Sequence, residues 1–480
     1  MKSAKKPCPW ALEPASSGMQ EALPDSLSPR RTAPGPGGFP GVGCLPEMRR
    51  DVLAMMLRGM REHGDVVRYK LGPWTVHLIC HPDSIGHVFT QPDRYDKDTF
   101  ASAKIRLMTG NGLLVSNGEQ WMSQRRAIQP AFAPSRVDGY IGLIVDRTKA
   151  MLDRWSVACR SGQSIDVASE MMRLTYGIIE QALFSSETQA GIGEIEEAVT
   201  IAMGHVYGRI QNPLSMPAFL PTPANLRFRR AIRTLESRVD AIIAEHRQGA
   251  RQHDLLHDFI QGATASECSH WDDRSLRSQV VTLLLAGHET TANSLTWLWY
   301  LLDQHPEVAD RLHQESRQLP DHGPLNQVDL KALDYTSMTL RETMRLYTPI
   351  WAILRRVIQA DTVRGFSIPA GTLLIISPFV THRHPEFWTD SERFDPLRFD
   401  SDKLRSMHPY AYIPFGGGPR FCVGKNLARL EGLIIAAMVS QRFRLRLVPG
   451  QRAMMDPGIT LRCRDGLKMT VEARRDAKWG

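Results

Sequence analysis

The chain has 480 residues, of which 42% are hydrophobic and 23% are charged, a composition that excludes disorder as its dominant state. The 59 lysines and arginines exceed the 51 aspartates and glutamates by 8, and this charge favours acidic partners such as an electron-transfer protein, an anionic surface or nucleic acid. The seven scattered cysteines form no CxxC pair, which argues against a disulfide framework and a multi-cysteine zinc site and favours a reducing, cytoplasmic compartment.

Residues 1–45 are rich in proline, serine and glycine, which oppose both helix and sheet, so we expect a disordered tail followed by a single domain over 46–480. The basic start is not followed by an apolar run, so no secretory signal is expected. No stretch of about 18 apolar residues occurs, so we expect no membrane anchor. Two β-rich runs broken by Gly72-Pro73 predict a hairpin over 65–80.

The middle of the chain has the pattern of helices. Between about 118 and 347, apolar residues recur every three or four positions. Strand-like segments return at 350–380 and near the C-terminus, after a further helix that follows Cys422. Helices in the middle, with strands gathered from both ends, predict a mainly α (α+β) fold with a large helical domain and a small β-rich lobe.

Two helical segments carry polar pairs on one face. Trp121 and Arg125 lie four positions apart, and an indole N–H beside a guanidinium suits an anionic carboxylate. A core tryptophan next to a surface arginine is the alternative. Glu342 and Arg345 lie three positions apart, and taken alone such a pair is usually a solvated surface contact.

A long apolar helix is expected over 275–304, and its middle contains Gly287, Glu289 and Thr290. Glycine costs about 1 kcal/mol relative to alanine inside a helix, and a carboxylate is costly in a core. A distorted turn with a hydroxyl and an acid can open a pocket for dioxygen and relay protons to it. The alternative is a kink caused by hydroxyl bonding to the helix backbone, without catalysis.

The loop FGGGPRFCVG at 415–424 presents one thiol, that of Cys422, within a glycine-rich turn that a flat ligand can approach closely. The thiol precedes a predicted helix, whose free N–H groups and dipole stabilise a thiolate and are expected to lower its pKa. A single cysteine thiolate is a known ligand of haem iron. An ordinary buried cysteine is the alternative.

At this loop the chain resembles the cytochrome P450 family, whose pattern FxxGxRxCxG is matched by Phe415, Gly418, Arg420, Cys422 and Gly424. The resemblance implies the cytochrome P450 fold, with haem b between two central helices, and it implies that these five residues bind the haem. In particular, it makes Cys422 the axial iron ligand and Arg420 a propionate partner, with Phe415 packed beside the sulfur.

The string AGHETT resembles the oxygen-activation motif of the family. This implies that the hydroxyl of Thr290 holds dioxygen and its water network, and that Glu289 is the adjacent acid of proton delivery. The family also has a WxxxR helix in contact with a haem propionate, which implies that role for Trp121 and Arg125.

The family carries an ExxR pair that is completed by a later arginine. Glu342, Arg345 and Arg398 match this set, which implies a structural clamp on the side of the cysteine loop. For the second haem propionate we expect Arg355, with Arg356 as the alternative.

The resemblance implies a haem-thiolate monooxygenase that inserts one oxygen atom of O2 into a hydrophobic small molecule. No dinucleotide fingerprint is present, so electrons are expected from an external ferredoxin and ferredoxin reductase. Arg126, Lys425 and Arg429 are a candidate docking patch for an acidic partner, with ordinary solvated charges as the alternative. We expect no nucleic-acid partner.

The segments expected to line the substrate pocket are mostly apolar, which predicts a hydrophobic substrate. The individual pocket candidates are Leu285, Ala286, Ile350, Ile353 and Ile459.

The stretches HGDVVRYKLGPWTV and QRRAIQPAF are similar to bacterial sesquiterpene-oxidising members of the family, which favours a terpenoid substrate over a fatty acid. A peroxide-dependent relative would need no external electrons, and a haem-based sensor would need the cysteine loop but neither Glu289 nor Thr290. His253 and His257 are spaced for metal binding, but no third ligand accompanies them, so a polar helix face is expected there.

Overall fold

A computed structural model describes residues 31–185, 192–212, 215–248, 254–265, 271–320 and 325–474. The helices are α1 (Leu45–His63), α2 (Pro82–Thr90), α3 (Phe100–Thr109), α4 (Gly118–Ile128), α5 (Pro134–Val137), α6 (Ile141–Ser161), α7 (Val167–Phe184), α8 (Ile192–Gln211), α9 (Pro223–Arg247), α10 (Leu255–Ala265), α11 (Asp273–Gln304), α12 (Pro306–Ser316), α13 (Gln327–Lys331), α14 (Asp334–Leu346), α15 (Pro378–Thr381), α16 (Ser401–Ser406) and α17 (Lys425–Arg442). Short 3₁₀ turns are η1 (Gln129–Phe132), η2 (Asp138–Tyr140), η3 (Pro396–Phe399) and η4 (Gly418–Arg420).

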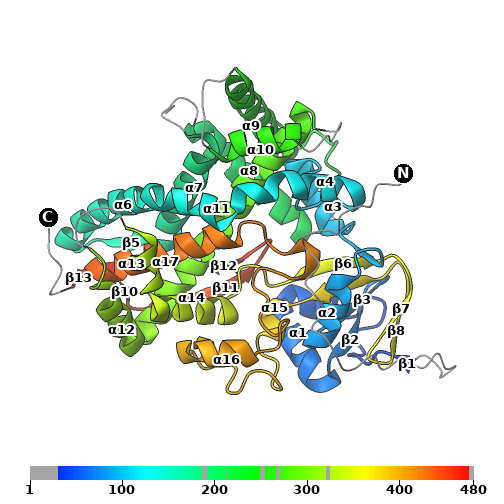
Figure 1. The fold of residues 1–480 in the computed structure, drawn as a ribbon. Coiled ribbons are helices and arrows are strands. Elements are labelled where there is room, and N and C mark those ends of the chain that lie inside the picture. Colours follow the sequence, from blue (N-terminus) through cyan, green and yellow to red (C-terminus); the bar gives the residue numbers. More distant parts are fainter. Residues whose placement is uncertain are drawn as a thin grey trace, which may run out of the picture.

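The strands are β1 (Arg31–Thr32), β2 (Val66–Leu71), β3 (Trp74–Ile79), β4 (Tyr95–Asp96), β5 (Ser164–Asp166), β6 (Ile353–Val357), β7 (Asp361–Val363), β8 (Phe366–Ile368), β9 (Leu373–Ile376), β10 (Phe443–Leu447), β11 (Met454–Pro457), β12 (Leu461–Arg464) and β13 (Lys468–Ala473). Helices form most of the molecule, and the largest sheet lies at one side with α1 and α2 (Figure 1). The predicted mainly α fold with a small β-rich lobe is confirmed.

The largest sheet has five strands in the order β2-β3-β9-β6-β4. The predicted hairpin is its antiparallel pair β2–β3, which runs in register from Val66 opposite Ile79 to Leu71 opposite Trp74. Strand β9 joins β3 in parallel and β6 in antiparallel orientation. Strands from both ends of the predicted helical region therefore meet in one sheet, whose strand β6 contributes to the site described below.

The segment before α1 departs from the prediction of a disordered tail over 1–45. Residues 1–30 lie outside the described residues, but Arg31–Thr32 pairs in parallel with β8. Gly43 has a φ of +62° and forms a bridge to Leu71, and a Cβ on this glycine would lie 2.1 Å from the backbone oxygen of Lys70. The glycines here allow close packing against the sheet. A glycine-rich composition alone does not tell such a packed segment from a disordered one.

Helix α11 runs through the main apolar cluster and packs against α7, α17, α14, α9 and α3. Residues on nearly all of its sides are buried, as expected of an enclosed helix. The side chain of Asp272 caps its first turn by accepting a hydrogen bond from the Ser275 backbone N–H. None of the described helices combines the length and apolarity needed to cross a membrane.

Candidate active site

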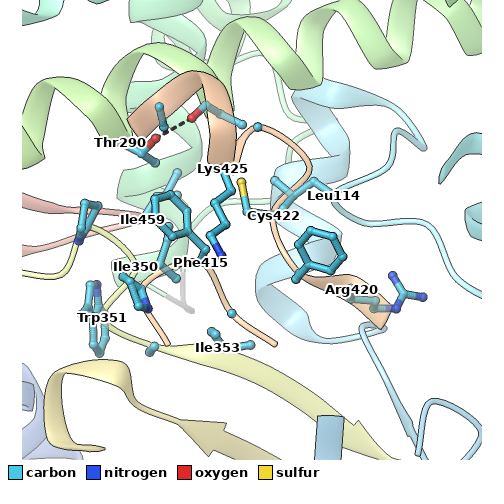
Figure 2. Close-up of a pocket in the computed structure, with 18 of the residues that line it drawn as sticks. Leu114, Thr290, Ile350, Trp351, Ile353, Phe415, Arg420, Cys422, Lys425 and Ile459 are labelled. Atoms are coloured by element: carbon cyan, nitrogen blue, oxygen red, sulfur yellow. Dashed lines mark hydrogen bonds between the residues drawn. The ribbon is translucent and has the colours of Figure 1, made fainter. Parts of the chain in front are cut away.

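A cavity of about 1940 Å³ lies between the β-rich lobe and the central helices. Its walls come from α3, α11, α17, strand β6 and the loop over 414–424. Figure 2 shows the sulfur of Cys422 beside this space, with Thr290, Ile350 and Ile459 around the same opening. The volume and the mostly apolar wall suit an organic ligand of considerable size.

The loop that presents Cys422 is shaped by its glycines. Gly416 and Gly418 have positive φ angles of +71° and +62°, and a Cβ on Gly418 would lie 2.5 Å from the Phe89 backbone oxygen. The Cys422 N–H donates to the Phe415 carbonyl at 2.9 Å, which closes the loop just before α17 begins. The thiol is accessible from the cavity, as a metal ligand must be.

The protonation of this thiol differs from the sequence expectation. Burial raises the pKa of Cys422, although the Gly424 backbone N–H and the cations Arg125 and Lys97 act in the opposite direction. Burial among the surrounding groups therefore opposes the expected lowering by the helix N-terminus, although the residue is exposed to the cavity.

Four cationic side chains converge on the cavity beside this loop: Lys97, Arg125, Arg355 and Arg420. Arg125 and Arg355 are only 7% and 5% exposed. Burial lowers the pKa of Arg355 to about 10, and repulsion from Arg420 adds to this. The pKa of Lys97 is lowered well below its usual value, first by burial and then by the three arginines. This concentration of buried positive charge fits a ligand with two carboxylates.

The hydrogen bonds that these cations make within the protein leave a donor free to bind such a ligand. Arg125 donates through Nη1 to the Phe421 carbonyl at 2.8 Å, while its Nη2 is buried and has no partner. Arg420 donates to the Ser116 carbonyl at 2.9 Å, and its guanidinium lies 4.4 Å from the ring centre of Trp121. A buried guanidinium nitrogen without an acceptor is costly, so an anionic ligand at this point would stabilise the protein.

The structure separates Arg355 from its neighbour Arg356. The two residues are successive on β6, so their side chains point to opposite faces of the sheet. Arg355 is buried at the cavity, whereas Arg356 is exposed and forms an ion pair of 2.6 Å with Asp96. Arg355 is therefore better placed than the alternative to bind a group in the cavity.

The long helix expected over 275–304 is α11, which continues without interruption from Asp273 to Gln304 through the turn where a distortion was expected. Gly287 instead permits a close approach of α7, because a Cβ there would lie 2.9 Å from the Ile179 side chain. Thr290 faces the cavity and donates to the Ala286 carbonyl at 2.7 Å. The hydroxyl of Thr290 is thus held by the helix itself, within the cavity.

Two predicted residues of α11 do not reach the cavity. Leu285 packs in the helical core, and Glu289 is 5% exposed and interacts with Thr460 and Arg462. Burial raises the pKa of Glu289. Each helical residue is rotated by about 100° from the last, so Ala286 and Thr290 face the cavity whereas Leu285 and Glu289 face other elements. The prediction that Leu285 lines the pocket is wrong, and Glu289 is not brought beside Thr290 in the cavity.

The remaining pocket candidates, Ala286, Ile350, Ile353 and Ile459, all line the cavity. Trp351 lies within the segment 350–353 that was expected to line the pocket, and its indole N–H donates to the Gly458 carbonyl at 2.9 Å, which ties two walls together. Sequence reasoning missed Lys97 and Glu431, which also line the cavity. No local pattern marks Lys97, and Glu431 could be suspected only as an acid within a predicted core helix.

Glu342 and Arg345 form a fully buried ion pair, so the alternative of a solvated surface contact is wrong. Both side chains have 0% exposure, and Nε of Arg345 lies 2.6 Å from Oε2 of Glu342. The same guanidinium donates to the carbonyls of His382 and Ser391. Arg398 approaches Glu342 to 3.4 Å. The three predicted residues are thus brought together, and they join α14 to the segment that leads into the cysteine loop.

The candidate docking residues Arg126, Lys425 and Arg429 are all exposed, but Lys425 and Arg429 also line the cavity, and the side chain of Lys425 points into it (Figure 2). Burial, followed by repulsion from Arg341, lowers the pKa of Arg429. Of the histidine pair considered for metal binding, His253 lies outside the described residues. No group of three or more potential metal ligands occurs among the histidine, cysteine and acidic residues that the structure describes.

Comparisons with known proteins agree with this architecture. A family model described as cytochrome P450 matches residues 33–464. The chain is 35% identical to cyclooctat-9-en-7-ol 5-monooxygenase of Streptomyces melanosporofaciens over 88% of this chain and 91% of the relative. It is 30% identical to pentalenene oxygenase of Streptomyces avermitilis over 86% and 91% of the two chains.

The fold is also similar to a solved structure, the haem domain of cytochrome P450DA. The TM-score is 0.84 at 27% identity, and the match covers 93% of this chain and 98% of that one. The predicted cytochrome P450 fold is confirmed. With a family match that spans the cavity walls and the cysteine loop, the chain belongs to the cytochrome P450 family of haem-thiolate monooxygenases.

Proposed function

We propose that this chain oxidises a terpenoid hydrocarbon or alcohol at the cavity above Cys422, with haem b as its cofactor. The observation that carries the proposal is the apolar wall formed by Ala286, Ile350, Ile353 and Ile459. Such a wall binds lipophilic compounds by excluding water and offers few groups that would orient a polar one. The two relatives named for terpenoid oxidation support this substrate class.

The cofactor assignment follows from the donor set. Cys422 supplies the sulfur ligand, and Lys97, Arg125, Arg355 and Arg420 supply positive charge for two propionates. Trp121, in contact with Arg420, belongs to the same wall. When bound, haem supplies the iron at which O2 is reduced and one of its oxygen atoms becomes available for insertion into a C–H bond.

The chain's own contribution to oxygen chemistry is assigned to Thr290. Its hydroxyl lies on the cavity face of α11 and donates a hydrogen bond of 2.7 Å to the Ala286 carbonyl. Reorientation of this hydroxyl would let it hold a water or an oxygen species in the cavity. Glu289, which faces Thr460 and Arg462, would need to change its side-chain orientation to take part.

A fatty acid is the second candidate substrate, and it is favoured by Arg209. This arginine lines the cavity, is buried, and has an Nε without a hydrogen-bond partner. A carboxylate would satisfy that nitrogen. A terpenoid without a carboxylate would leave it unpaired.

For electrons we propose an external ferredoxin and its reductase. Arg126, Lys425 and Arg429 are exposed near the cysteine loop and would attract an acidic partner, although Lys425 and Arg429 also line the cavity. The described cysteines are all free thiols, which supports a reducing compartment, and localisation to the cytoplasm stays a prediction.

The test begins with the absorption spectrum of the haem-loaded protein, reduced and exposed to carbon monoxide. A strongly red-shifted Soret band is expected from thiolate ligation. Titration with sesquiterpenes, diterpenes and fatty acids should then give a low- to high-spin change with terpenoids. A change with fatty acids alone would assign the second candidate.

Turnover separates the remaining alternatives. NADPH consumption with ferredoxin and ferredoxin reductase, together with oxygenated product, is expected for the proposed enzyme. Product formed only with added hydrogen peroxide would indicate a peroxide-dependent relative. Haem binding without product under either condition would favour a sensor.

A further inference from the structure

Arg209 is a buried cation in the cavity wall. It lies in the last turn of α8, is 6% exposed, and lines the cavity together with Ile210. Its Nη1 donates to the Met216 carbonyl at 2.8 Å, whereas its Nε is buried and has no hydrogen-bond partner. A buried guanidinium donor without an acceptor is costly, so an acceptor supplied by a ligand in the cavity would stabilise this arginine.

The acids around Arg209 are distant or have other partners. Those of α8 lie in its first two turns, roughly three helical turns or more away. Two helices pack against α8: α3 contains no acid, and α9 contains none before Glu236, which pairs with Arg277. Asp456 of β11 accepts hydrogen bonds from Tyr207 and Arg462. Within the described part of the chain, no acid therefore compensates the charge of Arg209.

His205 lies one turn before Arg209 on the same face of α8. Its ring stacks on that of Phe228 from α9, with the ring centres 4.3 Å apart, and its Nε2 is buried without a hydrogen-bond partner. Burial lowers the pKa of His205, and repulsion from Arg209 lowers it further. The histidine is therefore neutral at pH 7, and the positive charge at this end of α8 comes from Arg209.

Arg209 and Cys422 belong to different walls of the cavity. Helix α8 packs against α9 and α3, whereas the cysteine loop leads into α17, which packs against α12, α6, α11 and α14. Figure 1 shows α8 near α9 in the upper part of the view and α17 below it. The cations assigned to the haem propionates come from α4, β6, η4 and the segment after β4. Arg209 is therefore left for a different ligand in the cavity, the substrate.

We propose that Arg209 is a specificity-determining residue that binds an acceptor oxygen at one end of the substrate, with a carboxylate as the strongest acceptor. The proposal rests on the proposed oxygenase function and narrows its substrates to lipophilic compounds with such an oxygen: terpenoid alcohols, terpenoid acids or fatty acids. The charge of the guanidinium strengthens the hydrogen bond, and the other walls are mostly apolar. Because the oxygen is held at α8, the opposite end of the substrate extends toward Cys422 and is oxidised.

The first test compares farnesene, farnesol and farnesoic acid, which share one sesquiterpene skeleton, by the change in spin state that each causes in the haem-loaded protein. Wild type should bind farnesoic acid most tightly and farnesene least tightly. In Arg209→Gln the preference for the acid over farnesene should fall about tenfold or more, because a charged hydrogen bond is lost, while farnesene affinity should stay the same. An unchanged preference would overturn the proposal. Dodecanoic acid, added as a fourth ligand, shows whether a fatty acid uses the same residue.

Two further variants separate the charge of Arg209 from its contact with the Met216 carbonyl. Arg209→Lys keeps the charge and should retain part of the preference for the acid. Arg229→Gln is the matched control, because Arg229 donates to the Ala218 and Phe219 carbonyls of the same connection between α8 and α9 but is exposed and does not line the cavity. It should keep wild-type selectivity. An equal loss in the control would assign the effect to this connection and contradict the role of Arg209.

The position of oxidation gives an independent result. With NADPH, ferredoxin and ferredoxin reductase, wild type should oxidise farnesoic acid in the half of the molecule remote from the carboxylate, and Arg209→Gln should give a mixture of positions, which mass spectrometry of the products measures. Oxidation next to the carboxylate by wild type would overturn the proposed orientation. A wild-type protein that yields no product from any of these compounds would contradict the proposed function, while the binding comparison would still decide whether Arg209 binds an acceptor oxygen.

Discussion

Glu342 and Arg345 form an ion pair from which water is completely excluded, and Arg345 also holds the backbone of the segment that leads to the cysteine loop. Glu342 further accepts a hydrogen bond from the Asp395 backbone N–H at 2.9 Å. The pair therefore joins α14 to the chain over 382–395. This connection is the main structural role of the pair, because a buried ion pair by itself contributes little net stability.

We predict that Glu342→Gln lowers the free energy of unfolding by about 3–5 kcal/mol, because it leaves the charge of Arg345 buried without a counter-charge. Urea unfolding of the protein without haem measures this loss, and haem content after purification should fall with it. Asp402→Asn is the control, since Asp402 also pairs with an arginine three positions away, Arg405, but on an exposed helix. The control should change stability by less than about 1 kcal/mol.

A second prediction concerns the thiol. In Cys422→Ser the red-shifted Soret band of the reduced, carbon monoxide-treated protein should be lost, because a hydroxyl is a harder and less acidic donor than a thiol. Cys159→Ser should keep the band, since Cys159 is a half-buried free thiol of α6 outside the cavity. A retained thiolate spectrum in the first variant would assign the ligand to another residue.

The third prediction tests whether the Thr290 hydroxyl has a role that another threonine hydroxyl on the same helix does not have. Thr290→Ala should bind haem and substrate normally but release a larger share of its electrons as hydrogen peroxide, because the cavity loses a group that orders water and passes protons. Thr296→Ala is matched to it: Thr296 is buried on the same helix and donates to the carbonyl four positions earlier at 2.8 Å, away from the cavity. Equal peroxide release by both variants would remove the role assigned to Thr290.

The fold class and the cysteine loop were predictable from local patterns, namely periodic apolar residues and consecutive glycines around one cysteine. The clamp followed only from the family resemblance, because an acid and a base three positions apart, taken alone, indicate a solvated surface pair. The sequence did not predict features that depend on how a residue is rotated around its helix or on contacts between segments that are far apart in the chain. Glu289 is adjacent to Thr290 in sequence, yet the helix turns it toward Thr460.

Glu431 lines the cavity from a helix more than 100 residues later in the chain, and no spacing rule predicts that it does. Gly287 shows the same limit. It was interpreted as part of a distorted turn, whereas the close approach of Ile179 from α7 accounts for the glycine.

The last prediction concerns Arg355, which is buried among like charges in the absence of a ligand. Removing it should stabilise the protein without haem, because the repulsion from Arg420 and the cost of burying a guanidinium both disappear. We therefore expect Arg355→Gln to raise the unfolding free energy of that form by roughly 1–3 kcal/mol. The same variant should bind haem less tightly, since one positive charge facing the cavity is lost.

Arg356→Gln provides the comparison, because Arg356 is exposed and pairs with Asp96 on the other face of β6. It should leave haem affinity unchanged and alter stability by no more than about 1 kcal/mol. Thermal unfolding with and without haem measures both effects in one experiment. If Arg355 is held in place for an anionic ligand, Arg355→Gln should raise the stability of the protein without haem and lower that of the haem-loaded protein. A loss of stability in both forms of Arg355→Gln would instead make it a structural residue of the sheet.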